Sequence, residues 1–210
     1  VCQSSEIFYL MPEEIIEINK TVYDTAQEIY RNGGRKMMIV SSGHVADDID
    51  VQARELCKLA ESGTDALIWI TNRLDINNEG DDVWLANAEK LLKLLPEDVK
   101  LGLYECPSPY KRLLTPRILK WCIETGRVYF IKDTCCDAQV IKERVEILKG
   151  SGLYLLNANC QTLLQSLKDG GSGYCGIMCN YHPRLYTWLC QNFDKEPEKA
   201  ELVQSFLGTS

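Results

Sequence analysis

Histidine and basic charge are both scarce in this chain of 210 residues. It has two histidines, and 23 Lys and Arg stand against 30 Asp and Glu, which gives a net charge of −7. This charge argues against a nucleic-acid partner, which would require a basic face. No C-x-x-C pair occurs, so no zinc or other metal site is expected. No apolar run approaches the roughly 20 residues that span a bilayer, and the first residues lack a signal-peptide pattern, so no membrane partner is expected either.

Cysteine, by contrast, is frequent, with ten residues in the chain. Several of them lie inside apolar runs, as small buried hydrophobic side chains do. A chain of this length with 45% hydrophobic residues can bury a full core and needs no disulfide framework. We therefore predict free thiols in a reducing, cytoplasmic setting.

Short apolar runs alternate with longer amphipathic segments along the whole chain. The runs cover residues 37–40, 66–70, 101–104, 128–131, 153–156 and 174–178. Each run is continuously apolar, which is typical of parallel strands covered on both faces. Helical periodicity is found in residues 15–29, 53–60, 88–95, 116–126, 137–150, 163–167, 185–189 and 200–207. The order is therefore one helix followed by six β-α units.

This order is compatible with a doubly wound sheet or a (β/α)8 barrel. No G-x-G-x-x-G motif follows any run, which disfavours the dinucleotide-binding fold. We predict an α/β protein with a TIM-barrel fold, in which the first β-α unit and the second strand are missing from this sequence. Residues 1–193 would form the barrel domain, and residues 194–210 would begin a truncated C-terminal helical extension after a solvated linker.

A lysine stands where chemistry is expected in such a fold. Active sites of α/β folds lie at the carboxyl ends of the strands, and Lys132 directly follows the run 128–131. An amine beside apolar neighbours loses its proton more readily than one in water and can attack a carbonyl as a Schiff-base nucleophile. Tyr104 ends the run one β-α unit earlier, so it can be a neighbour and shuttle a proton. Taken singly, Lys132 is also compatible with a solvated loop residue, and Tyr104 with an aromatic plug of the barrel.

Four short motifs, in this order and spacing, resemble those of the dihydrodipicolinate synthase and N-acetylneuraminate lyase family. Residues 3–6 resemble its G-[ST]-T-G-E loop, and residues 104–107 (Y-E-C-P) resemble its Y-N-x-P motif. Residues 131–134 (I-K-D-T) resemble its Schiff-base strand, and residues 170–184 resemble its G-x-x-G-x-I-S…N-x-x-P-R stretch. The similarity runs from Val1 to about Phe193.

The resemblance implies a barrel of the class I aldolases, which form an imine with pyruvate or a related 2-keto acid. By this resemblance Lys132 forms the imine, Tyr104 is the proton shuttle, Ser4 and Ser5 hold the substrate carboxylate, and Thr134 lines the pocket. By their positions at the ends of the runs or in the motifs, the further candidates for substrate binding are Arg73, Asn157 and Ile177. The resemblance also implies no metal or organic cofactor, and a homo-oligomer that is a tetramer or a dimer.

The chain departs from the family pattern at several positions. Synthases carry T-P-Y-Y where residues 71–74 read T-N-R-L, so the relay tyrosine is absent. The arginine that binds a second carboxylate is replaced by Pro109, with Lys111 and Arg112 close by. The acidic pair of the sialate lyases is replaced by residues 157–160, N-A-N-C. A lysine-biosynthetic synthase is therefore disfavoured. Arg73 indicates an anionic or polyhydroxylated substrate, although a surface arginine is an equal alternative.

Three functions remain compatible with these residues. The first is a Schiff-base aldolase or lyase that acts on pyruvate or another 2-keto acid. The second is a dehydratase of a sugar-derived keto acid that uses the same imine. The third is a barrel that has lost turnover and binds a ligand. Other residues are weaker candidates: His44 can belong to the loop before its helix, and Cys135 and Cys136 have no activating base near them in sequence.

Overall fold

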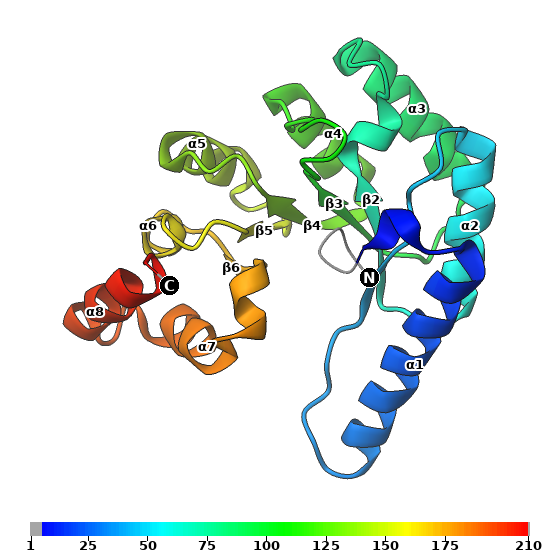
Figure 1. Cartoon of the computed structure of the whole chain (residues 1–210). Helices are drawn as coiled ribbons and strands as arrows, with labels where there is room; N and C mark the ends of the chain where they lie inside the picture. The colour runs from blue at the N-terminus through cyan, green and yellow to red at the C-terminus, as the bar shows by residue number, and fades with distance from the viewer. Residues whose placement is uncertain (1–5, 210) are drawn as a thin grey trace. The chain divides into compact units, whose positions relative to one another are not determined.

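The computed structural model describes residues 6–209 of the chain. The chain divides into two compact units, Val1–Arg112 and Leu113–Ser210. Both units alternate parallel strands with helices, as the sequence predicts (Figure 1). No helix within residues 6–209 is both long enough and apolar enough to cross a bilayer.

The first unit holds three short parallel strands. Its elements are η2 (Ile7–Tyr9), α1 (Pro12–Arg31), β1 (Val40–Ser42), α2 (Ile49–Glu61), β2 (Ala66–Ile70), η3 (Thr71–Leu74), α3 (Asp81–Leu94) and β3 (Leu101–Tyr104). β2 lies between β1 and β3, with Ser42 opposite Ile68 and Ile70 opposite Tyr104. Every residue of β2 is buried, which explains why its run is continuously apolar rather than alternating.

The second unit repeats the same arrangement with three strands, five α-helices and a further turn of helix. Its elements are α4 (Pro116–Thr125), β4 (Val128–Asp133), α5 (Ala138–Leu148), β5 (Tyr154–Asn157), α6 (Leu163–Lys168), β6 (Gly173–Tyr174), η4 (Ile177–Asn180), α7 (Pro183–Asn192) and α8 (Pro197–Leu207). β5 lies between β4 and β6, with Lys132 opposite Leu156 and Asp133 opposite Asn157.

Two of the predicted strands are displaced in the structure. Residues 37–39 form no ladder and belong to an extended connection after α1, where Met37 and Met38 are exposed (Figure 1). Strand pairing begins only at Val40, opposite Ala66. The predicted strand 174–178 is also wrong, because β6 ends at Tyr174 and the following residues form η4. Apolar side chains alone therefore did not locate the strand ends.

Three helix starts, those of α2, α4 and α5, are fixed by capping side chains that the sequence displays. Asp48 accepts hydrogen bonds from two backbone N–H groups at the start of α2, and Asp137 does the same for α5. Thr115 caps α4 ahead of a proline in the first turn, and Gly126 ends that helix in a left-handed conformation. These ends agree with the prediction for α4 and α5.

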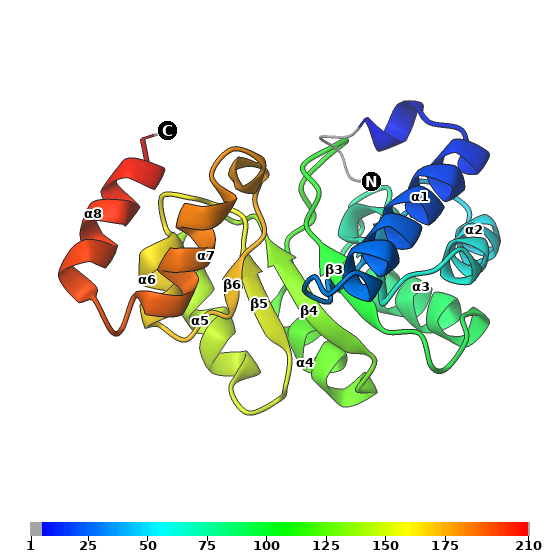
Figure 2. The same ribbon diagram turned by 90° about the horizontal axis from the view of Figure 1, so that it is seen from below.

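The last helix packs into the second unit rather than extending away from it. α8 begins at Pro197, three residues before the predicted start, and Ala200 and Leu207 are fully buried. They join Leu163, Leu189 and other apolar residues of α6 and α7 in one cluster. Figure 2 shows α8 beside α6 and α7. The Gln204 side chain adds hydrogen bonds to this packing: it donates to the Cys160 carbonyl (2.8 Å) and accepts from the Leu164 N–H (2.8 Å).

Candidate active site

The two faces of the strands in the first unit can be told apart by one hydrogen bond. The Ser41 hydroxyl donates to the Asn19 side chain of α1, so Ser41 points to the helices. Successive side chains of a strand point to opposite faces, and residues paired in register share a face. Ser42, Ile70 and Tyr104 therefore lie on the face turned away from the helices, which we call the inner face of the unit.

The same argument orients the second unit. The Asp133 carboxylate accepts a hydrogen bond from the Arg144 guanidinium of α5, so Asp133 points to the helices. Lys132, the penultimate residue of β4, therefore lies on the inner face, together with its register partner Leu156. Lys132 and Tyr104 thus each lie near the carboxyl end of a strand, on the inner face of their own unit, where α/β folds place reacting groups.

A tight turn follows Lys132. The second oxygen of Asp133 accepts from the Cys135 N–H (2.9 Å), and Cys136 adopts a left-handed conformation (φ 62°). The chain then enters α5 through the Asp137 cap. Thr134 lies in this turn and is partly buried. Burial raises the pKa of the Cys135 thiol to about 12, and the Asp133 carboxylate acts in the same direction, so this thiol is not activated as a nucleophile.

Two of the predicted binding residues in the second unit, Asn157 and Ile177, do not lie on the inner face that carries Lys132. Asn157 shares the helix side with its register partner Asp133, and it is fully buried. Its amide donates to the Thr162 hydroxyl (2.9 Å) and accepts from the Asn159 N–H (2.7 Å), so it shapes the loop before α6. Ile177 lies on η4 rather than on a strand, and 55% of its surface is exposed. Neither residue shares the inner face of β4 and β5 with Lys132.

Arg73 is held by contacts within the first unit. Its guanidinium forms an ion pair with Asp47 (2.8 Å) and lies 5.3 Å from the ring centroid of Phe8. Its backbone carbonyl accepts from Gln52 (3.0 Å). The Arg73 side chain is only 14% exposed, so it is not the surface arginine that the sequence left open as an alternative.

The arginine close to Pro109 takes part in a buried ion-pair network. Arg112 donates to Asp75 (2.9 Å) and Asp81 (2.7 Å). Asp75 is fully buried and also accepts from the N–H groups of Glu79 (2.7 Å) and Gly80 (3.1 Å). Arg112 therefore ties its loop to the start of α3, which is a structural role.

His44 likewise has a structural environment that the sequence did not reveal. It is fully buried; its Nδ1 accepts from the Ile70 N–H (2.8 Å), and its Nε2 lies 2.6 Å from the Gln52 oxygen. Because Nδ1 accepts, the proton is on Nε2, which donates to Gln52. Burial lowers the pKa of His44 to about 4, so the ring is neutral and links β2 to α2.

Some buried polar atoms at the strand ends of the first unit lack a partner within the described part of the chain; of their residues, Arg73 was a predicted binding residue, whereas Ser42 and Asn72 were not selected from the sequence. Ser42 Oγ, Asn72 Oδ1 and Arg73 Nε are buried and have no hydrogen-bond partner among residues 6–209. All three follow or end the adjacent strands β1 and β2 at their carboxyl ends. Buried polar atoms are usually paired, so this edge retains unused hydrogen-bonding capacity. Ser42 was visible in the sequence at a strand end, but the absence of a partner for its hydroxyl among residues 6–209 was not.

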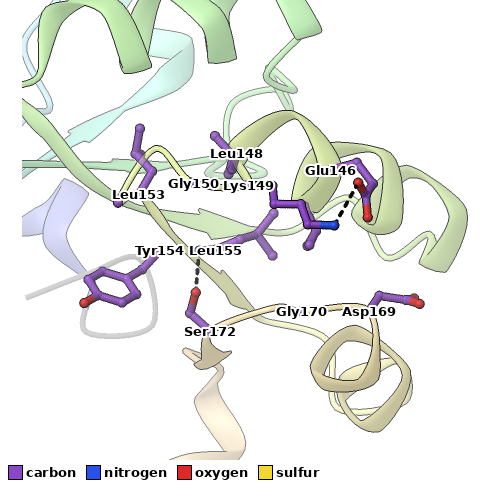
Figure 3. A pocket seen from close by; sticks show the side chains of 12 residues that line it. Glu146, Leu148, Lys149, Gly150, Leu153, Tyr154, Leu155, Asp169, Gly170 and Ser172 are labelled. Atoms are coloured by element: carbon purple, nitrogen blue, oxygen red, sulfur yellow. Dashed lines mark hydrogen bonds and ion pairs between the residues drawn. The ribbon is translucent and has the colours of Figure 1, made fainter.

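A pocket of about 310 Å³ lies at the other end of the strands in the second unit. Figure 3 shows its lining, which includes the Glu146–Lys149 ion pair and the Ser172 hydroxyl, which accepts from the Leu155 N–H. These residues come from the ends of α5 and α6 and the starts of β5 and β6. The pocket is therefore remote from Lys132 along the strands.

The carboxylate loop predicted from residues 3–6 is described only at Glu6. Ser4 and Ser5 lie outside the described residues, so their role remains a prediction. Within residues 6–209, no three Asp, Glu, His or Cys side chains are grouped as metal ligands.

Comparison with solved structures identifies the fold. YagE from Escherichia coli K12, a prophage protein of the dihydrodipicolinic acid synthase family solved in complex with pyruvate, superposes with a TM-score of 0.83 at 18% identity, over 98% of this chain and 66% of that one. Dihydrodipicolinate synthase from Bacteroides thetaiotaomicron gives a TM-score of 0.82 at 18% identity, over 99% and 66% of the two chains. A monomeric dihydrodipicolinate synthase variant gives 0.75 at 16% identity, over 90% and 62%.

No family model matches the sequence, and no curated protein does. The structural likeness nevertheless confirms the predicted α/β barrel fold, and it is the fold of the family that the motifs resemble. The chain spans between 62 and 67% of the length of these solved chains.

Proposed function

We propose that this chain belongs to the dihydrodipicolinate synthase family and is a class I aldolase or lyase that acts on pyruvate or another 2-keto acid. The observation that carries the proposal is Lys132: it lies in the I-K-D-T motif, on the inner face of β4 and next to the carboxyl end of that strand. The fold is shared with a family member whose structure was solved with pyruvate.

The proposed reaction begins with attack of the Lys132 amine on the C2 carbonyl of the keto acid. The carbinolamine that forms loses water to give an imine, and Tyr104 passes a proton to the departing oxygen. In an aldolase, the protonated imine then accepts the electron pair of the breaking C3–C4 bond, while the C4 hydroxyl loses its proton and leaves as an aldehyde; the resulting enamine is protonated at C3. In a dehydratase, the imine accepts the electron pair of a C3–H bond, and the enamine then expels the C4 hydroxyl, which takes up a proton and leaves as water. Hydrolysis of the imine returns the amine. Because the imine itself is the electron sink, the reaction needs no metal or organic cofactor.

Ser4 and Ser5 are proposed to bind the substrate carboxylate, with Thr134 beside the imine. Arg73 is proposed to bind a more distant anionic or hydroxylated part of the substrate. Arg112 is engaged by the buried carboxylate of Asp75 and the partly exposed carboxylate of Asp81. This engagement favours a substrate that lacks the second carboxylate of the lysine-biosynthetic reaction, and it keeps the sugar-acid dehydratase as the second candidate.

Reductive trapping tests the proposal. Incubation with pyruvate and borohydride should attach a reduced pyruvate adduct to Lys132, which peptide mass spectrometry locates. Lys132→Ala should abolish the adduct. The exposed lysine of α5 provides a matched control, because Lys142→Ala should leave labelling unchanged.

A panel of 2-keto sugar acids separates the candidate functions after trapping has succeeded. Release of pyruvate indicates an aldolase, whereas loss of water from the substrate indicates a dehydratase. An adduct without turnover would favour a ligand-binding barrel. Absence of any adduct on folded protein would remove every imine mechanism.

The cellular compartment and the oligomeric state of the protein are proposed from two separate observations. All nine cysteines from residue 6 onward are free thiols, which supports a reducing, cytoplasmic environment. A homo-oligomer, tetramer or dimer, is proposed from the family resemblance. Sedimentation of the purified chain would measure its mass against the 23.9 kDa of one copy.

A further inference from the structure

Cys135 and Cys136 are the only adjacent cysteines in the chain, and the proposed chemistry uses neither of them. They lie in the turn between β4 and α5, within the second unit. Both are free thiols; Cys136 is exposed, and Cys135 is partly buried. A small molecule that reacts with thiols therefore has access to the pair from solvent.

The two thiols extend along the turn in opposite, crossing directions. The Cys135 thiol donates forward to the Asp137 carbonyl (3.6 Å), and the Cys136 thiol donates back to the Thr134 carbonyl (3.3 Å). Each sulfur is thus directed along the chain past the other cysteine. Thiols are weak hydrogen-bond donors, so a ligand that replaces both S–H groups removes only weak contacts. The bonds from the Cys135 N–H to Asp133 (2.9 Å) and from the start of α5 to Asp137 involve no sulfur.

The spacing of the pair disfavours a direct disulfide. The peptide between the two cysteines is trans, and adjacent Cα atoms across such a peptide are about 3.8 Å apart. Disulfides usually join Cα atoms that are about 4.4–6.8 Å apart, and departures from this geometry strain the bond and make it easier to reduce. One larger atom inserted between the two sulfurs lengthens the bridge and relieves this strain.

The number and the protonation of the sulfurs restrict the identity of the bridging atom. Within residues 6–209 no three Asp, Glu, His or Cys side chains are grouped as metal ligands, whereas a structural zinc ion requires about four. Zinc also binds deprotonated sulfur, and burial raises the pKa of the Cys135 thiol to about 12. Trivalent arsenic that carries one organic group needs only two thiols, and its oxygen takes up both thiol protons as water.

We propose that Cys135 and Cys136 form a binding site for trivalent arsenicals, which the two sulfurs hold as a cyclic dithioarsonite. In the reaction, an arsenic(III) oxide R–As=O and two S–H groups give two As–S bonds and one water molecule. The As=O bond and both S–H bonds break, both protons leave on the oxygen, and arsenic stays trivalent, so no oxidant or reductant is required. The inference is independent of the proposed function, because Lys132 takes no part in this reaction.

The test uses phenylarsine oxide and the reduced full chain. One equivalent is added, excess 2-mercaptoethanol then removes arsenic that is held by a single thiol, and mass spectrometry locates the arsenic that is retained. One phenylarsenic group should remain on the tryptic peptide of residues 133–142, and 2,3-dimercaptopropanol should release it. Cys135→Ser and Cys136→Ser should each weaken retention about 100-fold or more, because each variant forms only one As–S bond and loses the gain of intramolecular closure.

Cys57→Ser is the matched control, because Cys57 is a partly buried thiol of α2 without an adjacent cysteine. This variant should retain phenylarsenic as the parent protein does. Circular dichroism should show parental folding in all three variants, since no backbone hydrogen bond of the turn depends on sulfur. Parental retention in either turn variant would overturn the inference. So would a parent protein that retains no arsenic after the monothiol wash, or that retains it on a different peptide.

Discussion

At the scale of the residue, His44 shows how burial sets a charge state. The ring lies between the Ile70 N–H and Gln52, and burial lowers its pKa from the usual 6.5 to about 4. The nearby Arg73 charge acts in the same direction. Between pH 6.5 and 4 the unfolded chain therefore binds a proton at His44 that the folded chain does not, so acid favours unfolding in this window.

We predict that His44 makes the protein less stable as the pH falls from about 6.5 to 4. The contribution is on the order of 3 kcal/mol, from the size of the pKa shift. His44→Asn keeps an acceptor for the Ile70 N–H and removes the titrating group. The difference in free energy of unfolding between parent and variant, measured in urea at a series of pH values, should shrink by this amount on acidification. A constant difference would show that folding does not lower the pKa of His44.

The candidate residues could be selected from the sequence, but their partners could not. Lys132 and Tyr104 were identifiable because each lies at the end of an apolar run. The face to which each side chain points then follows from counting residues along the strand. Arg112, in contrast, is paired with Asp75 and Asp81, more than thirty residues away in the chain. No local pattern predicts such a pairing, so a structural arginine and a substrate-binding arginine look alike in the sequence.

At the scale of the element, β4 owes its orientation to one buried ion pair. Asp133 and Arg144 are both almost fully buried, and Arg144 also donates to the Leu114 carbonyl (2.9 Å). The pair joins the end of β4 to α5. Since Lys132 is the preceding residue on the opposite face, this contact holds the strand that carries the proposed nucleophile.

We expect Arg144→Met to destabilise the protein by about 3–5 kcal/mol, because it leaves the Asp133 carboxylate buried without a cation. Arg184→Met, at an exposed position of α7, should change stability by less than about 0.5 kcal/mol. Urea unfolding followed by circular dichroism measures both. Adding Asp133→Asn to the Arg144 variant should recover much of the loss. Equal effects of the two arginine variants would contradict the role given to the ion pair.

The ends of a helix were predictable where a capping residue marks them. The ends of a strand were not predictable where only hydrogen bonding to a neighbouring strand determines them. The Thr115–Pro116 start and the Gly126 end of α4 were predictable because each has a local backbone cause. β1 and β6 were misplaced because a run of apolar residues does not say where a neighbouring strand offers hydrogen bonds. Met37 and Met38 are apolar but exposed, while Ser41 and Ser42 are polar and paired with β2.

At the scale of the whole molecule, the order of elements predicts the fold better than any stretch of identical residues does. The solved barrels compared here share only 16 to 18% of residues with the chain, yet they superpose over 90 to 99% of it. What they share is the succession of β-α units. Four short motifs in order predicted this fold, although no family model matches the sequence.

The proposed reaction needs a phenol and an amine, and we assign these roles to Tyr104 and Lys132. We predict that Tyr104→Phe slows formation of the trapped pyruvate adduct on Lys132 by about 100-fold or more, the usual contribution of a proton-transfer group. Tyr154→Phe, at an exposed tyrosine that begins β5, should retain the parental rate. Quenched-flow trapping with borohydride gives both rates, and thermal unfolding checks that the variants fold. If Tyr104→Phe reacts as fast as the parent, the proton must come from another group, and the inner face of β3 would have no part in the imine chemistry.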